Sequence, residues 1–222
     1  MNNMLKISGL IALSALGSLF AADAGKVAFV SGSAEVSRAG KWQKLALGAM
    51  VAEAEQVRTA KAGTLIIALK SGAALKLKPE TTLTIATADT NTAIELQGGS
   101  VFAKVDKRRS GQSFEIRAQT TVAAVRGTEF FFAYGKKEKS KSDLWLCVNE
   151  GRVNVTDGAT KSEVDVNAGE GIIVPTDKQI PKPKSYAWTK KLNWNMDAGK
   201  GGVEDKSSLK GAYSDLMKQN YD

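Results

Sequence analysis

Apolar and polar residues alternate along most of this chain, from Lys26 to Val174, in short runs that Gly, Ser, Asn and Asp interrupt. One run covers residues 65–69, the turn Ser71-Gly72 follows, and the alternation resumes at residue 75. A period of two places every second side chain on the same face of a strand, so this pattern favours β-sheet over helix. It predicts an all-β domain of about fifteen short strands, arranged as a β-solenoid-like roll or a sandwich. The runs have no fixed spacing, so the pattern does not establish a regular solenoid.

Glycine marks the breaks between these runs. It reaches the positive φ values that tight turns between strands need, whereas other residues do so at a cost. We therefore assign a structural turn role to the glycines at the breaks, namely Gly32, Gly72, Gly98, Gly127, Gly151 and Gly169.

The N-terminus has the layout of a secretory signal peptide. Residues 1–6 are short and basic, residues 7–20 are apolar, and Ala22-Asp23-Ala24 offers an A-x-A cleavage site, with an earlier one at Leu19-Phe20-Ala21. The apolar run is shorter than the roughly 20 residues that span a membrane. We therefore predict a signal peptide over residues 1–24 and a periplasmic or secreted mature chain without a transmembrane span.

The composition changes after Val174. Pro175, Pro181 and Pro183 lie among Lys and Thr residues, which indicates an extended linker. Beyond it, residues 188–194 and 209–217 carry apolar residues at spacings that favour short helices. We predict an all-β domain over residues 25–175, followed by a linker and a partly helical, mobile tail over residues 176–222. Whether this tail docks on the β domain stays open.

The residue types exclude much common enzyme chemistry. The chain has no His, which removes the commonest general base and the commonest metal ligand. The lone Cys147 lies in an alternating apolar run and is interpreted as a buried thiol. No motif for a phosphate, a dinucleotide or calcium occurs, so we expect no cofactor, no metal and no catalytic residue. One enzymatic alternative stays open, a glycan-active enzyme that uses two of the many carboxylates.

The net charge of +8 suggests an anionic partner outside the cytoplasm. In an exported protein we expect an envelope protein or an anionic cell-wall glycan rather than nucleic acid, and spread surface lysines also serve solubility. The candidate contacts are a basic loop and two tail tryptophans: Lys136, Lys137, Lys139, Lys141, Trp188 and Trp194. The sequence does not indicate an oligomeric state.

Several short motifs, in their order, resemble the FecR domain, a bacterial all-β envelope module. The similarity extends over residues 25–174. It opens with a strand, turn and strand in G-K-V-A-F-V-S-G-S-A-E-V, and the hairpin at residues 65–77 follows. The remaining matches are Gly48, Val57-Arg58-Thr59, Thr82-Leu83, Leu96 to Val101, Gly127-Thr128-Glu129-Phe130, Glu150-Gly151-Arg152-Val153 and Ala168-Gly169.

The resemblance implies an all-β periplasmic module. In the best-known arrangement of this family, the domain follows a cytoplasmic anti-sigma segment and one membrane helix, and it relays a signal from an iron-siderophore receptor. We expect this chain to depart from that arrangement, because a signal peptide is predicted at its start and neither a cytoplasmic segment nor a retained membrane helix is predicted. We therefore expect a non-catalytic envelope module with a scaffold or signalling role.

Overall fold

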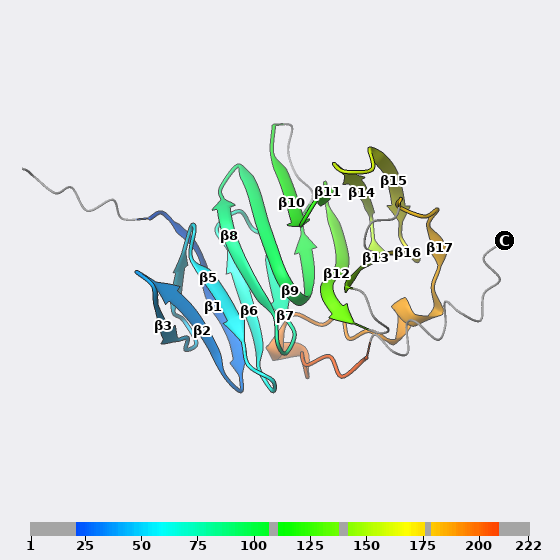
Figure 1. Ribbon diagram of the computed structural model, residues 1–222. Helices are drawn as coiled ribbons and strands as arrows, with labels where there is room; N and C mark the ends of the chain where they lie inside the picture. The colour runs from blue at the N-terminus through cyan, green and yellow to red at the C-terminus, as the bar shows by residue number, and fades with distance from the viewer. Residues whose placement is uncertain (1–20, 107–110, 138–141, 176–178, 209–222) are drawn as a thin grey trace, which may run out of the picture.

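The computed structural model describes residues 21–106, 111–137, 142–175 and 179–208. Within them, seventeen strands form one hydrogen-bonded sheet that folds over into two layers (Figure 1). Layer A contains β1 (Asp23–Ser31), β4 (Met50–Ala52), β6 (Thr64–Leu69), β7 (Ala74–Leu77), β12 (Thr128–Lys137), β13 (Ser142–Glu150), β16 (Glu170–Val174) and β17 (Lys184–Ser185). Layer B contains β2 (Ala34–Arg38), β3 (Lys41–Lys44), β5 (Gln56–Thr59), β8 (Thr82–Ala88), β10 (Ser113–Ala118), β11 (Thr121–Val125), β14 (Arg152–Asp157) and β15 (Ser162–Asn167).

The long strand β9 (Asn91–Val105) joins the two layers. Its first half pairs with β8 and, in parallel, with β10 in layer B, and its second half pairs with β7 and β12 in layer A. Along the chain, hairpins such as β10–β11, β12–β13 and β14–β15 are placed in alternate layers. The prediction of an all-β fold is confirmed.

The main core lies between the layers. Phe114 of layer B meets Phe130 of layer A edge to face, with ring centroids 6.4 Å apart. Every second residue of the facing strands points into this space, as the period of two predicts. The core includes Val27, Val36, Val57, Leu65, Ile67, Leu75, Leu77, Leu83, Ile85, Ile94, Val101, Phe132, Leu146, Val148, Val153 and Val155, all buried.

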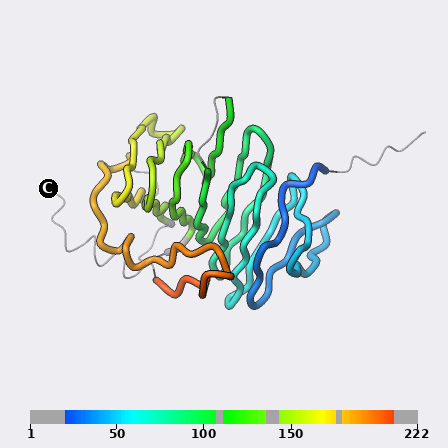
Figure 2. Tube along the Cα trace, turned by 180° about the vertical axis from the view of Figure 1, so that it is seen from behind, coloured from blue at the N-terminus to red at the C-terminus, as the bar shows by residue number. Residues whose placement is uncertain are grey.

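A second apolar cluster covers the outer face of layer A. The intervening residues of its strands, among them Phe102, Phe131 and Trp145, are buried under the C-terminal segment. We call residues 184–207 the strap. It starts at β17 beside β16 and runs back along layer A (Figure 2), where Glu204 accepts a hydrogen bond of 2.7 Å from the Ser31 hydroxyl of β1.

The strap lies against layer A, so this part of the tail docks on the β domain, a point that the sequence left open. Its secondary structure is limited to β17 and two short 3₁₀ helices, η1 (Ala187–Lys191) and η2 (Ala198–Lys200). Trp188 lies in η1 and is buried, together with Leu192 just beyond the helix. The helix expected at residues 209–217 falls outside the described residues.

Most of the predicted signal peptide, residues 1–20, also falls outside the described residues. Strand β1, however, begins at Asp23, within the predicted signal, and Ala24 is fully buried. No helix in the described part of the chain is both long enough and apolar enough to cross a membrane.

Candidate functional site

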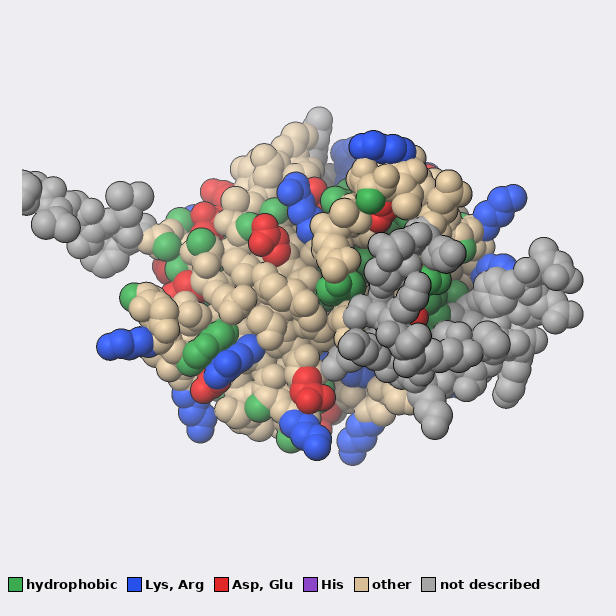
Figure 3. Space-filling model, viewed as in Figure 1, with side chains coloured by type: hydrophobic (Ala, Val, Ile, Leu, Met, Phe, Trp, Pro, Cys, Tyr) green, Lys and Arg blue, Asp and Glu red, His purple; other side chains and the backbone are tan. Residues whose placement is uncertain are grey.

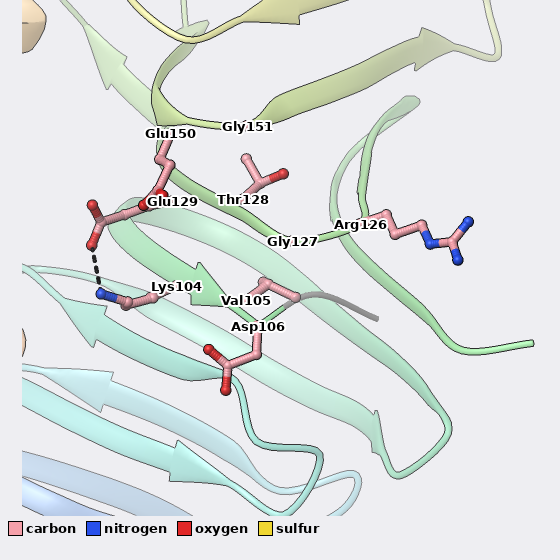
Figure 4. A pocket seen from close by; sticks show the side chains of 9 residues that line it. All are labelled: Lys104, Val105, Asp106, Arg126, Gly127, Thr128, Glu129, Glu150 and Gly151. Carbon is pink, nitrogen blue, oxygen red and sulfur yellow. Dashed lines mark ion pairs between the residues drawn. The ribbon is translucent and has the colours of Figure 1, made fainter. Parts of the chain in front are cut away.

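A cavity of about 600 Å³ opens where strand β9 ends beside two turns (Figure 4). Residues 104–106 come from the end of β9, and residues 126–129 come from the turn between β11 and β12 and the first residues of β12. Glu150 ends β13, and Gly151 forms the turn to β14. These are the turns of the V-R-G-T-E-F and N-E-G-R-V motifs. Pairing of β12 with both β9 and β13 brings the three segments together.

Close packing of the two turns shapes the cavity. Gly127 has a φ of 81° and Gly151 a φ of 83°, a left-handed conformation that favours glycine. A Cβ added to Gly151 would lie 2.5 Å from the Gly127 carbonyl oxygen. The buried Thr128 hydroxyl donates 2.9 Å to the carbonyl oxygen of Arg152, which ties the turns together. Thr128 therefore ties the two turns together, and Gly127 and Gly151 allow their left-handed backbone.

Glu129 is the buried acid of the site, with 7% of its surface exposed. The Asn149 amide donates 2.5 Å to its Oε2, and the Lys104 ammonium lies 3.7 Å from its Oε1 (Figure 4). Burying a carboxylate without such partners would be costly. Both oxygens of Glu129 thus have a partner, which is typical of a carboxylate that holds structure.

The exposed lining residues have mixed charge. Asp106 and Glu150 bring two more carboxylates, and Lys104 and Arg126 are basic. In Figure 4, Arg126 points away from the acidic side chains. Within the described residues, no group of His, Cys, Asp and Glu could hold a metal ion. A cavity of this kind suits a partner that offers both hydrogen-bond donors and acceptors.

The structure separates the predicted contact residues. Lys136 and Lys137 belong to the end of β12, where the backbone is in register with Asp143 and Ser142 of β13. Residues 139 and 141 lie outside the described residues. Trp188 is only 5% exposed and stacks edge to face on Phe131, so a role as a free contact is wrong for it.

Trp194 packs in the same way. It is half-buried, it meets the Phe102 ring edge to face, and its Nε1 donates 3.0 Å to the carbonyl oxygen of Thr189. On the face seen in Figure 3, basic side chains stand singly among acidic ones rather than in one patch. The basic residues of that face therefore fit solubility better than a single anionic contact.

The other turn glycines mostly lie at chain reversals. Gly32, Gly72 and Gly169 have φ values of 67°, 86° and 82°. Gly98 lies inside β9, in register with Thr82, so a turn role is wrong for it. Its neighbour Gly99 has a φ of 103°, and a Cβ there would lie 2.4 Å from Thr81 Cα. The residue that must be glycine is therefore Gly99 rather than Gly98, at the point where β9 passes from layer B to layer A.

Cys147 is buried in the outer cluster, 1% exposed, and burial raises the pKa of its thiol to about 12. Such a thiol is a poor nucleophile, since the thiolate is the reactive form.

Sequence reasoning missed Lys76, which is completely buried on the outer face of layer A. A signal for that covered face does exist in the sequence. The runs V-F-A at 101–103 and F-F-F-A at 130–133 are apolar without alternation, and so is L-W-L-C-V at 144–148, which corrects its description as an alternating run. Such runs are typical of strands buried on both faces.

The fold and the site define an all-β module of two layers. Its mixed-charge cavity lies at the turns of the V-R-G-T-E-F and N-E-G-R-V motifs. The family model described as FecR protein matches residues 55–159, from the start of β5 to just beyond β14. Residues 55–159 therefore match the FecR family, and the resemblance seen in the sequence is confirmed over this part of the chain. Strands β1 to β4 and the strap lie outside the matched stretch.

Solved structures show a similar fold. Two crystal structures of a candidate anti-sigma factor from Parabacteroides distasonis ATCC 8503, at 1.65 Å and 2.50 Å resolution, align with a TM-score of 0.50 and 20% sequence identity. The alignment covers 59% of this chain and 59% of theirs, so this chain matches little more than half of that protein. A comparison with curated proteins gave no match. At this identity the likeness concerns the fold.

Proposed function

We propose that this chain is a non-catalytic FecR-domain module of the bacterial cell envelope, which binds a protein or cell-wall partner in a scaffold or signalling role. The observation that carries the proposal is the cavity built by the V-R-G-T-E-F and N-E-G-R-V turns. Its exposed rim has mixed charge, while its interior residues hold the turns in place. The FecR match and the predicted signal peptide support an envelope location.

A signalling role has support from the solved structures of similar fold, since their protein is described as a candidate anti-sigma factor. The chain lacks His throughout, and its only thiol is buried with a raised pKa. A binding role therefore needs fewer additional assumptions than a catalytic one.

Photo-crosslinking in intact cells tests the proposal. A photoreactive amino acid would replace Arg126 or Glu150, both exposed on the cavity rim, and the control would carry it at Lys61, an exposed residue of the turn between β5 and β6. We expect a crosslinked partner from the cavity positions alone. Protease sensitivity of the added mass would indicate a protein, and sensitivity to a muramidase would indicate cell-wall glycan. The same products from all three positions would contradict a cavity-specific partner.

The glycan-active alternative is favoured by one observation, the three carboxylates Asp106, Glu129 and Glu150 around one cavity. A glycosidase needs one carboxyl as proton donor and a second as nucleophile or base. Glu129 is engaged by Asn149 and Lys104, which leaves Asp106 and Glu150 for such a pair. Release of soluble fragments from purified cell wall, abolished by Glu150→Gln, would support this alternative over the binding role.

A further inference from the structure

The strap covers an apolar face with two aromatic anchors. Trp188 lies edge to face on Phe131, with ring centroids 5.5 Å apart, and Trp194 lies in the same way on Phe102, at 5.2 Å. Trp145 and other side chains of layer A complete the floor of this face. The indole rings bury large apolar areas and fix where the strap crosses the sheet.

Two lysines, Lys76 of β7 and Lys78 just beyond its end, fasten residues 193–207 of the strap. Lys76 Nζ donates 2.5 Å and 2.8 Å to the carbonyl oxygens of Asn193 and Asn195. Lys78 Nζ donates 2.5 Å to the Asp205 carboxylate and 2.8 Å to the carbonyl oxygen of Ser207. Three of these four acceptors are backbone carbonyls, which every polypeptide carries. The lysines therefore grip a chain at these points rather than a particular set of side chains.

Several polar groups in the outer part of the strap are hydrogen-bonded within the strap itself. The Asn193 amide donates to the carbonyl oxygens of Gly202 and Glu204, at 2.8 Å and 3.0 Å, and the Asp205 carboxylate accepts 2.5 Å from the Asn193 backbone N–H. Asn195 contributes further bonds inside the same loop. Residues 193–205 thus form a compact loop whose ends meet. None of these hydrogen bonds involves layer A, so none of them would have to break for the loop to separate from the sheet.

The anchoring lysine is expensive to bury. Lys76 is 0% exposed, and its ammonium lies 4.3 Å from the centroid of the Phe102 ring. Burial lowers its pKa to about 8, against a smaller opposite effect of the Asp205 charge. An apolar side chain at this position would cover the face without that cost. The desolvation of Lys76 therefore offsets much of what its hydrogen bonds contribute to holding the strap.

We propose that the strap is a displaceable lid, and that the face of layer A beneath it is a groove for an extended segment of a partner protein. The segment would carry aromatic side chains where Trp188 and Trp194 now lie and a carboxylate at the place of Asp205. The groove is a different surface from the turn cavity, so this proposal does not depend on the function proposed for the cavity.

An open groove would not stay bare, because a large exposed apolar patch favours association. The strap is tethered through β17, so it closes over the groove at a high effective concentration. A partner segment must therefore displace the strap to enter the groove. Changes that weaken the contacts of the strap with layer A should strengthen binding of a separate peptide to the groove.

Peptide binding to the full chain tests this exchange. The probe is a labelled synthetic peptide of residues 184–207, measured by fluorescence anisotropy against the wild-type chain and the double variant Trp188→Ala/Trp194→Ala. The variant keeps the groove and weakens only its internal occupant. We expect the variant to bind the peptide at least tenfold more tightly than the wild type. Equal affinity for the two chains, or no binding to either, would overturn the proposal.

Two controls separate the groove from unspecific adhesion. A peptide carrying the same two Trp→Ala changes should lose binding, and Lys78→Ala in the variant chain should weaken binding of the unchanged peptide. Full binding by the altered peptide would contradict the aromatic anchors.

Hydrogen exchange of the wild-type chain gives a test that does not depend on how the variant folds. A displaceable lid opens with a smaller free energy than global unfolding, so amides of residues 186–207 should exchange faster than those of β12 and β13. Exchange of both sets at one common rate would show that the strap opens only when the whole domain unfolds, and the lid would be ruled out.

Discussion

Single residues at the turn cavity hold backbone conformations that few side chains tolerate. Gly151 combines a left-handed φ with a carbonyl oxygen 2.5 Å from where its Cβ would lie. Gly40, in the turn between β2 and β3, has a similar φ of 76°, but nothing lies within 4 Å of its Cβ position. A side chain at Gly40 would meet backbone strain alone, whereas a side chain at Gly151 would meet backbone strain and a steric clash.

We predict that Gly151→Ala destabilises the domain more than Gly40→Ala. The left-handed backbone alone costs about 1 kcal/mol for a residue with a side chain. At Gly151 the contacts with Gly127 O and with Thr128 should add about 1 kcal/mol or more. Urea midpoints measure both losses, with equal m-values as the check on two-state unfolding. Equal midpoints for the two variants would mean that the turns move apart freely.

Lys76 gives the stability of the protein a pH dependence. Burial lowers its pKa from 10.5 to about 8 in the folded chain. Between these two values the unfolded chain binds a proton that the folded chain does not, so the free energy of unfolding rises with pH. The full window is worth about 3 kcal/mol.

We predict that this rise disappears in Lys76→Met, which keeps a long side chain and removes the charge. The measurement is the difference in unfolding free energy between the wild type and the variant, from pH 7 to pH 10.5. Burial also raises the pKa of Cys147 and of Tyr134, which lowers stability at high pH, but both groups are present in both chains and cancel. A difference that stays constant with pH would contradict the buried ammonium.

At the scale of elements, strand β1 is the first strand of the described sheet, and its start is held by backbone hydrogen bonds. Asp23 pairs with Ala52 of β4, and the carbonyl oxygens of Ala22 and Ala24 accept hydrogen bonds of 2.8 Å from Glu53 and Lys70. A cut after Ala24 would remove this start of the strand, whereas a cut after Ala21 would leave it whole. Of the two cleavage sites in the sequence, the earlier one is compatible with the complete sheet.

We predict that the exported chain starts at Ala22, which mass spectrometry of the mature protein would establish. A recombinant chain that starts at Ala22 should also be more stable than one that starts at Gly25, by about 2 kcal/mol, because the shorter chain loses two backbone hydrogen bonds and the buried Ala24. A mature N-terminus at Gly25 with undiminished stability would contradict this role of β1.

At the scale of the whole molecule, layer A separates two cores of different kind. One lies between the layers and is closed by paired strands, and the other lies under the strap and is closed by side chains. Phe130 and Phe131 are neighbours on β12, are equally buried, and point to opposite faces of the layer. Substitution of Phe130 therefore affects the core between the layers, and substitution of Phe131 affects the core under the strap.

We predict that Phe130→Ala lowers the free energy of global unfolding by about 3–5 kcal/mol, the usual cost of such a cavity. Phe131→Ala should mainly loosen the strap, so that limited proteolysis cuts residues 184–207 sooner while the β circular dichroism signal persists. Indistinguishable proteolysis of the two variants would mean that the two cores unfold as one.

Local pattern predicted the strands and most of the turn glycines. The alternation around residues 65–77 becomes the β6–β7 hairpin, and Gly127 lies in the turn expected for it. Prediction failed where the covering element is distant in sequence. Nothing in the local sequence marks Trp188 or Lys76 as buried. Trp188 is covered against Phe131 of β12, and Lys76 is covered by Asn193 and Asn195, more than a hundred residues away in the sequence.

The sequence by itself therefore determined the β class, the positions of the turns and the FecR resemblance. Each of these depends on neighbours within a few residues, where sterics and a period of two apply directly. The tertiary structure alone decided which turns share a cavity, which carboxylate is buried in it, and that the strap closes the outer face of layer A. Those outcomes depend on strand pairing and on which distant segment covers an apolar face, and the same side chain is exposed or buried according to that partner.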